Sequence, residues 1–462
     1  MITPTLPAGF RDMDAGAFAS RAYIIDILEG KFIQYGFQPL ATPAMEKLTT
    51  LLGKYGEEGD QLLFKVLNSG DYTDELQAAD ITLPASQFTE KISKKGLRYD
   101  LTVPLARYVV QNKHKLVFPF KRYQIQPVWR GERPQQGRYR EFYQCDVDIV
   151  GSAHLFHEAS LLAMSYEVLM ALGIPDFVIY LNHRQLLCAL ATHLGFGQSQ
   201  MALYQTLDKK DKIGKSAVEK LLIKQGLAKE GVTLLTKLFS QTANPFDECK
   251  RLVALLGSGA LAAGAIKELT TILDYIGHFN QAIIPKIVLD ATLARGMAYY
   301  TGAIFEIKVP NSGVGSIVGG GRYDDLTAIF GLKEMPGVGL SFGLARIYDI
   351  MKARQAFPPH LGHTTQILLV PMAQEMEAIA INHLTTLHKA GIAAELYPAG
   401  QRMKKSFAYA DKKHIPWVAI IGEKEVASGQ LSLKNMQTGH QGPCTCATLL
   451  ATLQGENKPA KA

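Results

Sequence analysis

The stretch RGERPQQGRYREFYQCDVDIVG, residues 130–151, combines arginines around a Pro/Gly turn with two carboxylates on a strand-like run. Together with the preceding KRYQIQPVWR, it predicts an antiparallel hairpin with a long loop at ERPQQG. Strand side chains alternate between two faces, so one face should carry Phe142, Gln144, Asp146 and Asp148. The intervening residues are mostly apolar and should pack against helices.

The strand before the loop offers a matching face, with Arg122, Gln124, Gln126, Val128 and Arg130. Two such strands would form a polar floor at an open surface. Arg130 can bind a phosphate through two parallel hydrogen bonds, and Phe142 can stack on a flat base. Gln144 and Asp148 can accept hydrogen bonds from an amine or an imidazole N–H. From these residues alone, a surface hairpin with cross-strand ion pairs is slightly favoured.

The composition is that of a globular protein with two or three domains: 462 residues, 47% hydrophobic and 20% charged. No apolar run is long enough to cross a bilayer, and the start MITPTLPAGFRDMD lacks the features of a secretory signal, so we expect no membrane association or export. Five scattered cysteines favour a reducing cytoplasm over a disulfide framework. Cys444 and Cys446 have no second pair or histidine cluster, so we predict no protein-held metal site.

The net charge of +7 is modest, but one segment, residues 113–141, concentrates eight Lys/Arg against two acidic residues. Such an excess attracts the phosphates of a nucleotide or of RNA, although a solvated basic edge explains it equally well. Two common nucleotide motifs are excluded. No P-loop sequence occurs, and GVGSIVGGG has Val318 where the dinucleotide fingerprint needs its third glycine.

Patterning along the chain divides it into four parts. We expect a large α+β domain at 1–351 with a helical insertion at about 184–280. A proline-rich linker at 352–365 would lead to a small α/β domain at 366–454, and the tail 455–462 would be disordered.

Three further stretches carry candidate ligand-binding residues. ARGMAYYTGAIFE places Arg295 near Tyr299 and Tyr300, and GVGLSFGLAR places glycines before Arg346. VGGGRYDDL contains three consecutive glycines, which let a backbone approach a ligand closely. Glycine-rich turns alone are weak evidence for a site.

These motifs together resemble the histidyl-tRNA synthetases, a family of class II aminoacyl-tRNA synthetases, over nearly the whole chain. GFQPLATPAM resembles motif 1, WRGERPQQGRYREFYQCDVDIVG motif 2, and GVGLSFGLARI motif 3. LARGMAYYTG and VGGGRYDDL are similar to the two histidine-specific signatures, and LRYDLTVPLARY matches the amino-acid-binding turn.

The resemblance implies an antiparallel catalytic sheet flanked by helices, a helical insertion and a C-terminal α/β anticodon-binding domain. It implies ATP-dependent ligation of L-histidine to tRNA(His) through a histidyl-adenylate, with Mg²⁺, and release of AMP and pyrophosphate. Because motif 1 normally lies at the subunit interface, it also implies a homodimer.

The resemblance assigns residues to each ligand. For histidine they are Asp100, Leu101, Thr102, Gln144, Asp148, Tyr299 and Tyr300. For ATP they are Arg130, Glu132, Phe142, Arg295 and Arg346, with Arg130 and Arg295 as the catalytic pair. For tRNA they are Arg133, Gln135, Arg138, Arg402, Lys404 and Lys405.

Two positions depart from the family pattern: Ala298 replaces the usual Asp or Asn, and Asp148 stands where some members have Glu. Two alternatives stay open. One is a non-catalytic, synthetase-like regulator that binds histidine or RNA. The other is a class II synthetase for a different amino acid, against which Gln144, Asp148 and Tyr300 argue because they suit an imidazole.

Overall fold

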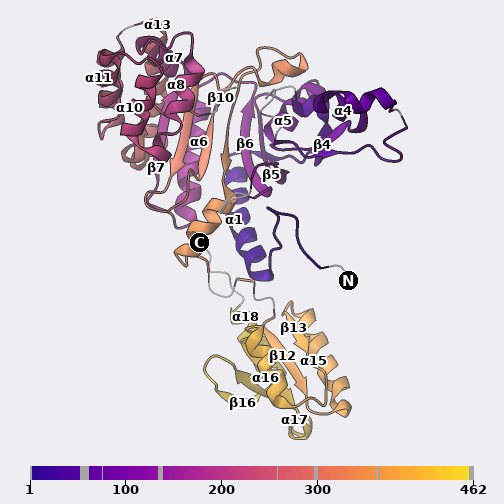
Figure 1. The fold of residues 1–462 in the computed structure, drawn as a ribbon. Coiled ribbons are helices and arrows are strands. Elements are labelled where there is room, and N and C mark those ends of the chain that lie inside the picture. Colours follow the sequence, from indigo (N-terminus) through magenta and orange to yellow (C-terminus); the bar gives the residue numbers. More distant parts are fainter. Residues whose placement is uncertain are drawn as a thin grey trace. The chain divides into compact units, whose positions relative to one another are not determined.

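The protein divides into two compact units (Figure 1), described here from a computed structural model. The large unit comprises Met1–Asp12 and Arg21–Phe357, and the small unit comprises Met13–Ser20 and Pro358–Ala462. The described residues are 3–52, 62–74, 76–133, 139–257, 259–295, 300–358, 361–362 and 365–456. The predicted tail therefore lies outside the described residues from position 457 onward. Among the described residues, no helix combines the length and apolar character needed to cross a membrane.

An eight-stranded sheet organises the large unit, in the order β1-β5-β6-β11-β10-β9-β7-β8. Its strands are β1 Gln38–Pro39, β5 Phe120–Trp129, β6 Glu141–Val150, β7 Val178–His183, β8 Ile287–Leu289, β9 Ala303–Lys308, β10 Val318–Tyr323 and β11 Gly337–Phe342. Neighbours are antiparallel except for β1–β5 and β7–β8 at the two ends. The predicted antiparallel catalytic sheet is confirmed.

The predicted hairpin is formed by β5 and β6, in uninterrupted register from Phe120–Val150 to Trp129–Glu141. The apolar face of β6 is confirmed, because Cys145, Val147 and Ile149 belong to the main hydrophobic core. The opposite face is polar as expected, but the expectation of an open surface is wrong over half of its length. Arg122 and Asp148 are 0% and 4% exposed.

Pro127 lies within β5 without disturbing the sheet. The outer neighbour β1 pairs with β5 at Arg122 and Tyr123, and no other strand of the described residues pairs with that edge at Pro127. Proline lacks an N–H donor and is tolerated at such an edge. Its carbonyl is still used, accepting a hydrogen bond from Arg98 Nε at 3.0 Å.

Three helices help to cover the apolar face: α1 Ala15–Gln34, α6 Phe156–Ala171 and α14 Leu344–Ala353. In α1 the buried residues Ile24, Leu28 and Phe32 recur every four positions, which places them on one helical stripe. They share a core with β6, and together they fix the sheet face that lies behind the candidate site.

A smaller layer follows α1 in the chain and was not predicted. It holds a three-stranded sheet, β2 Met45–Lys47, β4 Lys95–Leu97 and β3 Lys65–Val66, with α2 Leu48–Leu52, the 3-10 helix η1 Ala78–Thr82 and α4 Ala85–Ile92. The next helix, α5 Thr102–Asn112, carries Pro104 in its first turn, where proline is tolerated.

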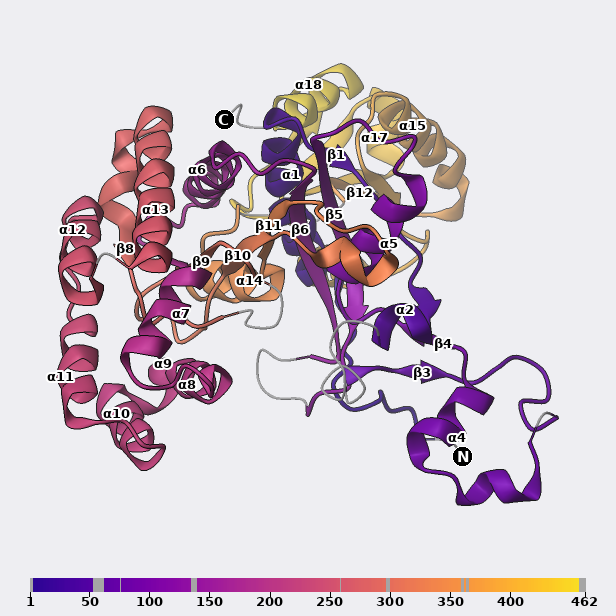
Figure 2. The ribbon, with the colours of Figure 1, turned by 90° about the horizontal axis from the view of Figure 1, so that it is seen from above.

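Between β7 and β8 the chain forms consecutive helices: α7 Arg184–His193, α8 Gln200–Leu207, α9 Lys210–Ile213, α10 Lys215–Lys224, α11 Lys229–Leu238, α12 Pro245–Leu256, α13 Ala260–Phe279 and the 3-10 helix η2 Gln281–Lys286. Figure 2 shows them gathered beside the β7–β8 end of the sheet, away from α4. A further 3-10 helix of the large unit, η3 Leu326–Phe330, follows β10.

The small unit has its own five-stranded sheet, in the order β13-β12-β14-β15-β16. The strands are β12 Ile367–Pro371, β13 Ala394–Leu396, β14 Trp417–Ile421, β15 Leu431–Asn435 and β16 Gln441–Cys444. The helical segments are η4 Gln374–Met376, α15 Glu377–Lys389, α16 Met403–Lys412, α17 Glu423–Ser428 and α18 Cys446–Glu456. The parallel strand β12 is buried on both faces, which explains its continuous apolar sequence.

A candidate active site at an arginine-lined cavity

A cavity of about 300 Å³ opens on the polar side of β5, β6, β10 and β11, next to the start of α14. Six residues predicted to bind substrates line it: Arg130, Glu132, Phe142, Gln144, Arg295 and Arg346. They come from segments up to about two hundred residues apart in the sequence, and the sheet brings them to one place. We call this the arginine cavity.

Each of the three arginines is oriented by a protein oxygen. Arg130 Nε donates to the carbonyl of Tyr99 at 3.0 Å. Arg346 Nη1 donates to the carbonyl of Ser316. Arg295 Nη2 lies 2.8 Å from Glu306 Oε1, and the Arg295 side chain is 45% exposed.

Three guanidinium groups against one carboxylate, that of Glu132, give the cavity lining an excess of positive charge, which favours an anionic ligand. Arg130 also lies 5.1 Å from the ring centroid of Phe142, within cation–π range. The cavity therefore combines phosphate-binding donors with an aromatic ring, which suits a nucleotide.

Asp148 lies on the same strand face as Gln144 but deeper, and it does not line the cavity. Its Oδ2 is 2.9 Å from Arg122 Nη2, and its Oδ1 accepts a hydrogen bond from the Tyr323 hydroxyl. Burial is the largest cause that raises the pKa of Tyr323 far above its ordinary value, followed by the Asp148 charge. Tyr323 therefore stays a neutral donor, and the carboxylate is held from both sides.

Asp100 begins the turn that leads into α5. Its Oδ1 accepts from the backbone N–H of Val103 at 3.0 Å, which satisfies one of the free donors at the helix start. The next two predicted histidine contacts, Leu101 and Thr102, are fully buried and half-buried respectively. None of the three lines the arginine cavity, although Arg130 is bonded to the preceding carbonyl of Tyr99.

The three consecutive glycines of β10 have different neighbours. Gly319 lines the cavity, and a Cβ there would meet nothing within 4 Å. A Cβ on Gly320 would lie 2.3 Å from the Gly339 carbonyl oxygen, and one on Gly321 would lie 2.9 Å from Tyr300 Cδ1. At Gly320 and Gly321 the space of the missing side chain is therefore occupied by neighbouring protein groups.

Sequence reasoning missed several residues that support the site. Glu306 pairs with Arg295, Tyr323 donates to Asp148, and Arg98 binds the Pro127 carbonyl from a position only 1% exposed. Tyr323 follows directly after the arginine of VGGGRYDDL, so that signature carried a signal for it. Arg98 lies in LRYDLTVPLARY and Glu306 ends ARGMAYYTGAIFE, but neither stretch indicates the group that the charged side chain contacts.

The residues predicted to contact RNA divide between the two units. Arg133 is exposed after β5, and Arg402, Lys404 and Lys405 are exposed at the start of α16. Gln135, Arg138 and Tyr299, and the unusual Ala298, lie outside the described residues.

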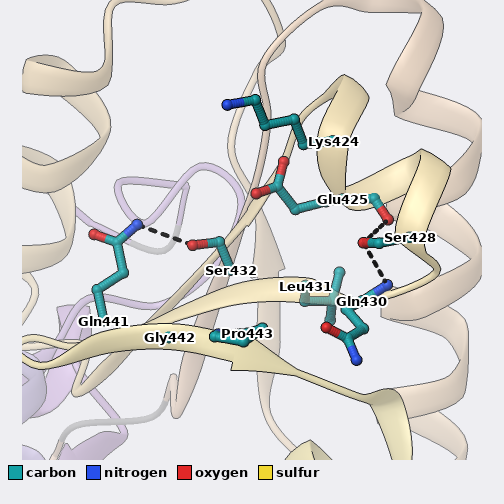
Figure 3. Close-up of a pocket in the computed structure, with 9 residues that line it drawn as sticks. All are labelled: Lys424, Glu425, Ser428, Gln430, Leu431, Ser432, Gln441, Gly442 and Pro443. Carbon is teal, nitrogen blue, oxygen red and sulfur yellow. Dashed lines mark hydrogen bonds between the residues drawn. The ribbon is translucent and has the colours of Figure 1, made fainter.

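A second pocket, of about 370 Å³, lies within the small unit between α17 and the strands β15 and β16 (Figure 3). Figure 3 shows Lys424, Glu425 and Ser428 on the helix side, while Gln441 Nε2 donates to Ser432 Oγ across the strands at 2.9 Å. The lining combines polar side chains with the apolar Leu431 and Pro443, and its charged residues are Lys424 and Glu425. We call it the α17 pocket.

The antiparallel sheet with its flanking helices and arginine cavity is the architecture of a class II aminoacyl-tRNA synthetase. Comparison with protein families agrees. Residues 9–347 match the family model for histidyl-tRNA synthetase, and residues 366–456 match the model for an anticodon binding domain.

Individual relatives give the same picture. The chain is 44% identical to the histidine–tRNA ligase of Cytophaga hutchinsonii, over 96% of this chain and 97% of that protein. It is 43% identical to the corresponding ligase of Porphyromonas gingivalis, over 98% and 100%. The crystal structure of histidyl-tRNA synthetase from Nostoc sp. PCC 7120 superposes with a TM-score of 0.82 at 27% identity, covering 99% of this chain and all of that one.

This chain therefore belongs to the histidyl-tRNA synthetase family.

Proposed function

We propose that this chain joins L-histidine to tRNA(His) at the arginine cavity, in an ATP-dependent reaction that passes through histidyl-adenylate. The observation that carries the proposal is the convergence of Arg130, Arg295 and Arg346 on one cavity with Phe142 and Gln144. Relatives named histidine–tRNA ligase, aligned over nearly the full chain, support the same activity. ATP is a substrate of this reaction.

In the first step, a carboxylate oxygen of histidine attacks the α-phosphorus of ATP and pyrophosphate leaves. Negative charge grows on the α-phosphoryl oxygens, where preorganised cations stabilise the transition state more than the ground state. Arg130 and Arg295 would supply this charge, and Arg346 and Phe142 would hold the adenine between them. Glu132 lines the same cavity and would contact ATP. The terminal ribose hydroxyl of the tRNA then attacks the adenylate and releases AMP.

Histidine would bind at the floor next to Gln144. Asp100, Leu101 and Thr102 would hold its α-ammonium group, and their turn is tied to the cavity wall through the Arg130–Tyr99 hydrogen bond. The imidazole would meet Gln144, Asp148, Tyr299 and Tyr300. A pocket built to pair with ring nitrogens rejects apolar amino acids of similar size, because these would leave its buried polar groups unpaired.

Mg²⁺ belongs to the same proposal, and the carboxylate of Glu132, which lines the cavity, fits it. Glu306 does not, because its Oε1 lies 2.8 Å from Arg295 Nη2 and its Oε2 lies 3.2 Å from Lys308 Nζ. Carboxylate oxygens and substrate phosphates are the ligands that Mg²⁺ prefers. Glu132 would hold the ion together with the phosphates, whose charge the ion neutralises when bound.

The tRNA contacts would involve both units. Arg133, Gln135 and Arg138 in the β5–β6 loop would meet the acceptor end near the cavity. Arg402, Lys404 and Lys405 on α16 would follow RNA phosphates, because exposed lysines and arginines bind a backbone without reading its sequence.

A homodimer in the cytoplasm completes the proposal. Motif 1 contributes β1, at the end of the large sheet, and β2, where Met45 is 50% exposed, an apolar side chain that a subunit interface would cover. All five cysteines are unpaired, which suits a reducing compartment. Sedimentation at micromolar concentration should give twice the mass of one chain, and a single-chain mass would remove the dimer from the proposal.

The deciding experiment is ATP–pyrophosphate exchange with a panel of amino acids. We expect exchange with histidine, which would require the nucleotide and amino-acid sites to work together. Absence of exchange with every amino acid would favour the non-catalytic regulator, which the intact set of arginines and the matched anticodon-binding region already argue against. Exchange with another amino acid and none with histidine would support a different specificity.

A further inference from the structure

Four polar side chains are buried beneath Gln144, where β5 and β6 run side by side. Arg122, Gln124, Asp146 and Asp148 are each at most 4% exposed. In the hairpin register Arg122 lies opposite Asp148, and Gln124 lies opposite Asp146. The electrostatic environment beneath the proposed imidazole site therefore depends on these two neighbouring pairs of side chains, because solvent hardly reaches them.

In the first pair, Arg122 holds the charge of Asp148. The distance from Arg122 Nη2 to Asp148 Oδ2 is 2.9 Å, and the Arg122 side chain is fully buried. Two charges at this distance in a dry environment interact far more strongly than they would at the surface. The Asp148 carboxylate thus has a buried cation directly beside it.

In the second pair, two acceptor oxygens lie on directly opposite residues. Asp146 Oδ1 and Gln124 Oε1 are both buried, and neither has a hydrogen-bond partner. Burial raises the pKa of Asp146 to about 7; Arg122 and a hydrogen bond from Ser341 oppose the rise, and Asp148 and Asp100 add to it. Protonation of Asp146 would give its unpaired oxygen a donor, so the charge of this pair changes within the physiological pH range.

We propose that the pocket binds the neutral form of the imidazole ring in preference to imidazolium, and that Arg122 is the positioning residue that determines this choice. The inference rests on the proposed function and deepens it. A protonated ring would lose its hydration and find a carboxylate whose charge is largely offset by Arg122. A neutral ring donates one N–H to Asp148 without that cost. Gln144 does not discriminate, because an amide can present either its oxygen or its NH₂ group.

The groups packed around Asp148 leave few other sources of a pH effect. They are Arg122 on β5, Asp146 on β6, Tyr323 on β10, and Asp100 and Tyr300 from the flanking segments. The fourth neighbouring strand, β11, presents Gly339 and has no side chain there. Of these groups, Asp146 is the one whose pKa lies at about 7, so its titration must be separated from that of the substrate.

The test compares two substrates in the pyrophosphate exchange assay on the wild-type full-length chain between pH 5.5 and 8. The KM for histidine should rise about tenfold per pH unit below the imidazole pKa of about 6.5, because the neutral ring becomes scarce. A histidine analogue with a triazole ring, which stays neutral over this range, should show a flat KM. Parallel profiles for both substrates, or a KM for histidine that falls at low pH, would overturn the inference.

Variants then assign the effect. Arg122→Lys keeps the buried cation and should keep the steep histidine profile. Arg122→Met removes it, leaves Asp148 as an uncompensated anion, and should flatten or invert the profile while the KM for ATP stays at the wild-type value. Asp146→Asn is the matched control and should retain the wild-type profile. A flat profile in Asp146→Asn would assign the pH effect to Asp146 and contradict the role of Arg122.

Failure of the inference and failure of the proposed function give different results. The absence of histidine-dependent exchange at every pH would count against the function itself. Exchange with a pH-independent KM for histidine would leave the ligase function standing and remove only the preference for the neutral ring. If Arg122→Met does not fold, the comparison of histidine with its triazole analogue on the wild-type chain still decides the preference for the neutral ring, and a flat histidine profile in Arg122→Lys would still contradict the role of Arg122.

Discussion

The arginine cavity and the α17 pocket are of similar size, about 300 and 370 Å³, but they are built differently. Buried charged side chains lie beneath the arginine cavity, among them the ion pair of Arg122 with Asp148. The α17 pocket is lined by side chains such as Lys424 and Ser428, which lie at the surface. The difference teaches that a site is preorganised by what lies beneath its lining, because buried partners cannot be replaced by water.

The same contrast appears between two ion pairs in which an arginine binds a carboxylate through two hydrogen bonds. Arg322 binds the Glu158 carboxylate through Nε and Nη2 at 2.5 and 2.8 Å, and the two side chains are 6% and 0% exposed. Arg354 binds Asp176 through two hydrogen bonds at 2.6 and 2.7 Å, with 34% and 52% exposure. If burial decides the importance of a pair, these two should respond very differently to the loss of one partner.

The largest expected effect is that of Glu158→Gln. It removes the nearer carboxylate of the buried Arg322 guanidinium, which keeps only Asp324 at 3.5 Å, and should lower the free energy of unfolding by about 3–5 kcal/mol. The matched Asp176→Asn, at the exposed pair, should cost at most about 1 kcal/mol. Urea unfolding of both variants against the wild-type chain measures the difference, and equal losses would break the comparison.

The next largest effect concerns catalysis. Arg295→Ala removes a cation from the cavity and should slow adenylate formation by about 10²–10³-fold, the usual cost of losing one preorganised transition-state donor. The fold should persist, because the Arg295 side chain is 45% exposed. Single-turnover kinetics with histidine and ATP measure the rate, and Arg354→Ala serves as the control. Near-normal turnover in Arg295→Ala would remove its catalytic role.

The smallest effect should come from the exposed face of α16. The triple variant Arg402→Ala, Lys404→Ala and Lys405→Ala should raise the KM for tRNA several-fold and make its salt dependence shallower by up to about three units. Pyrophosphate exchange, which needs no tRNA, should not change. Lys389→Ala, an exposed lysine on α15 of the same unit, is the control. A change in the exchange rate itself would contradict the proposed division between the two regions.

The sequence predicts the hairpin and its two faces well, because strand alternation is a local property. It also identified six residues that the structure brings to one cavity. It did not reveal that Arg122 and Asp148 are buried, because alternation assigns a face but does not say what covers it. Tyr323, which pairs with Asp148 across the sheet, lies 175 residues away in the chain. Strands as short as Lys65–Val66 are too brief to show any periodicity.

Gly339 limits how this pocket can be redesigned. A Cβ at that position would lie 2.0 Å from Asp148 Oδ1. Glycine is the smallest residue, so no substitution in β11 at this position can make more room for the carboxylate. An engineer who wanted a longer acid at position 148, or a bulkier heterocycle as substrate, would gain no volume from this strand. The extra room would have to come from Tyr323 or Arg122, and any such change would also disturb the groups that hold the carboxylate in place.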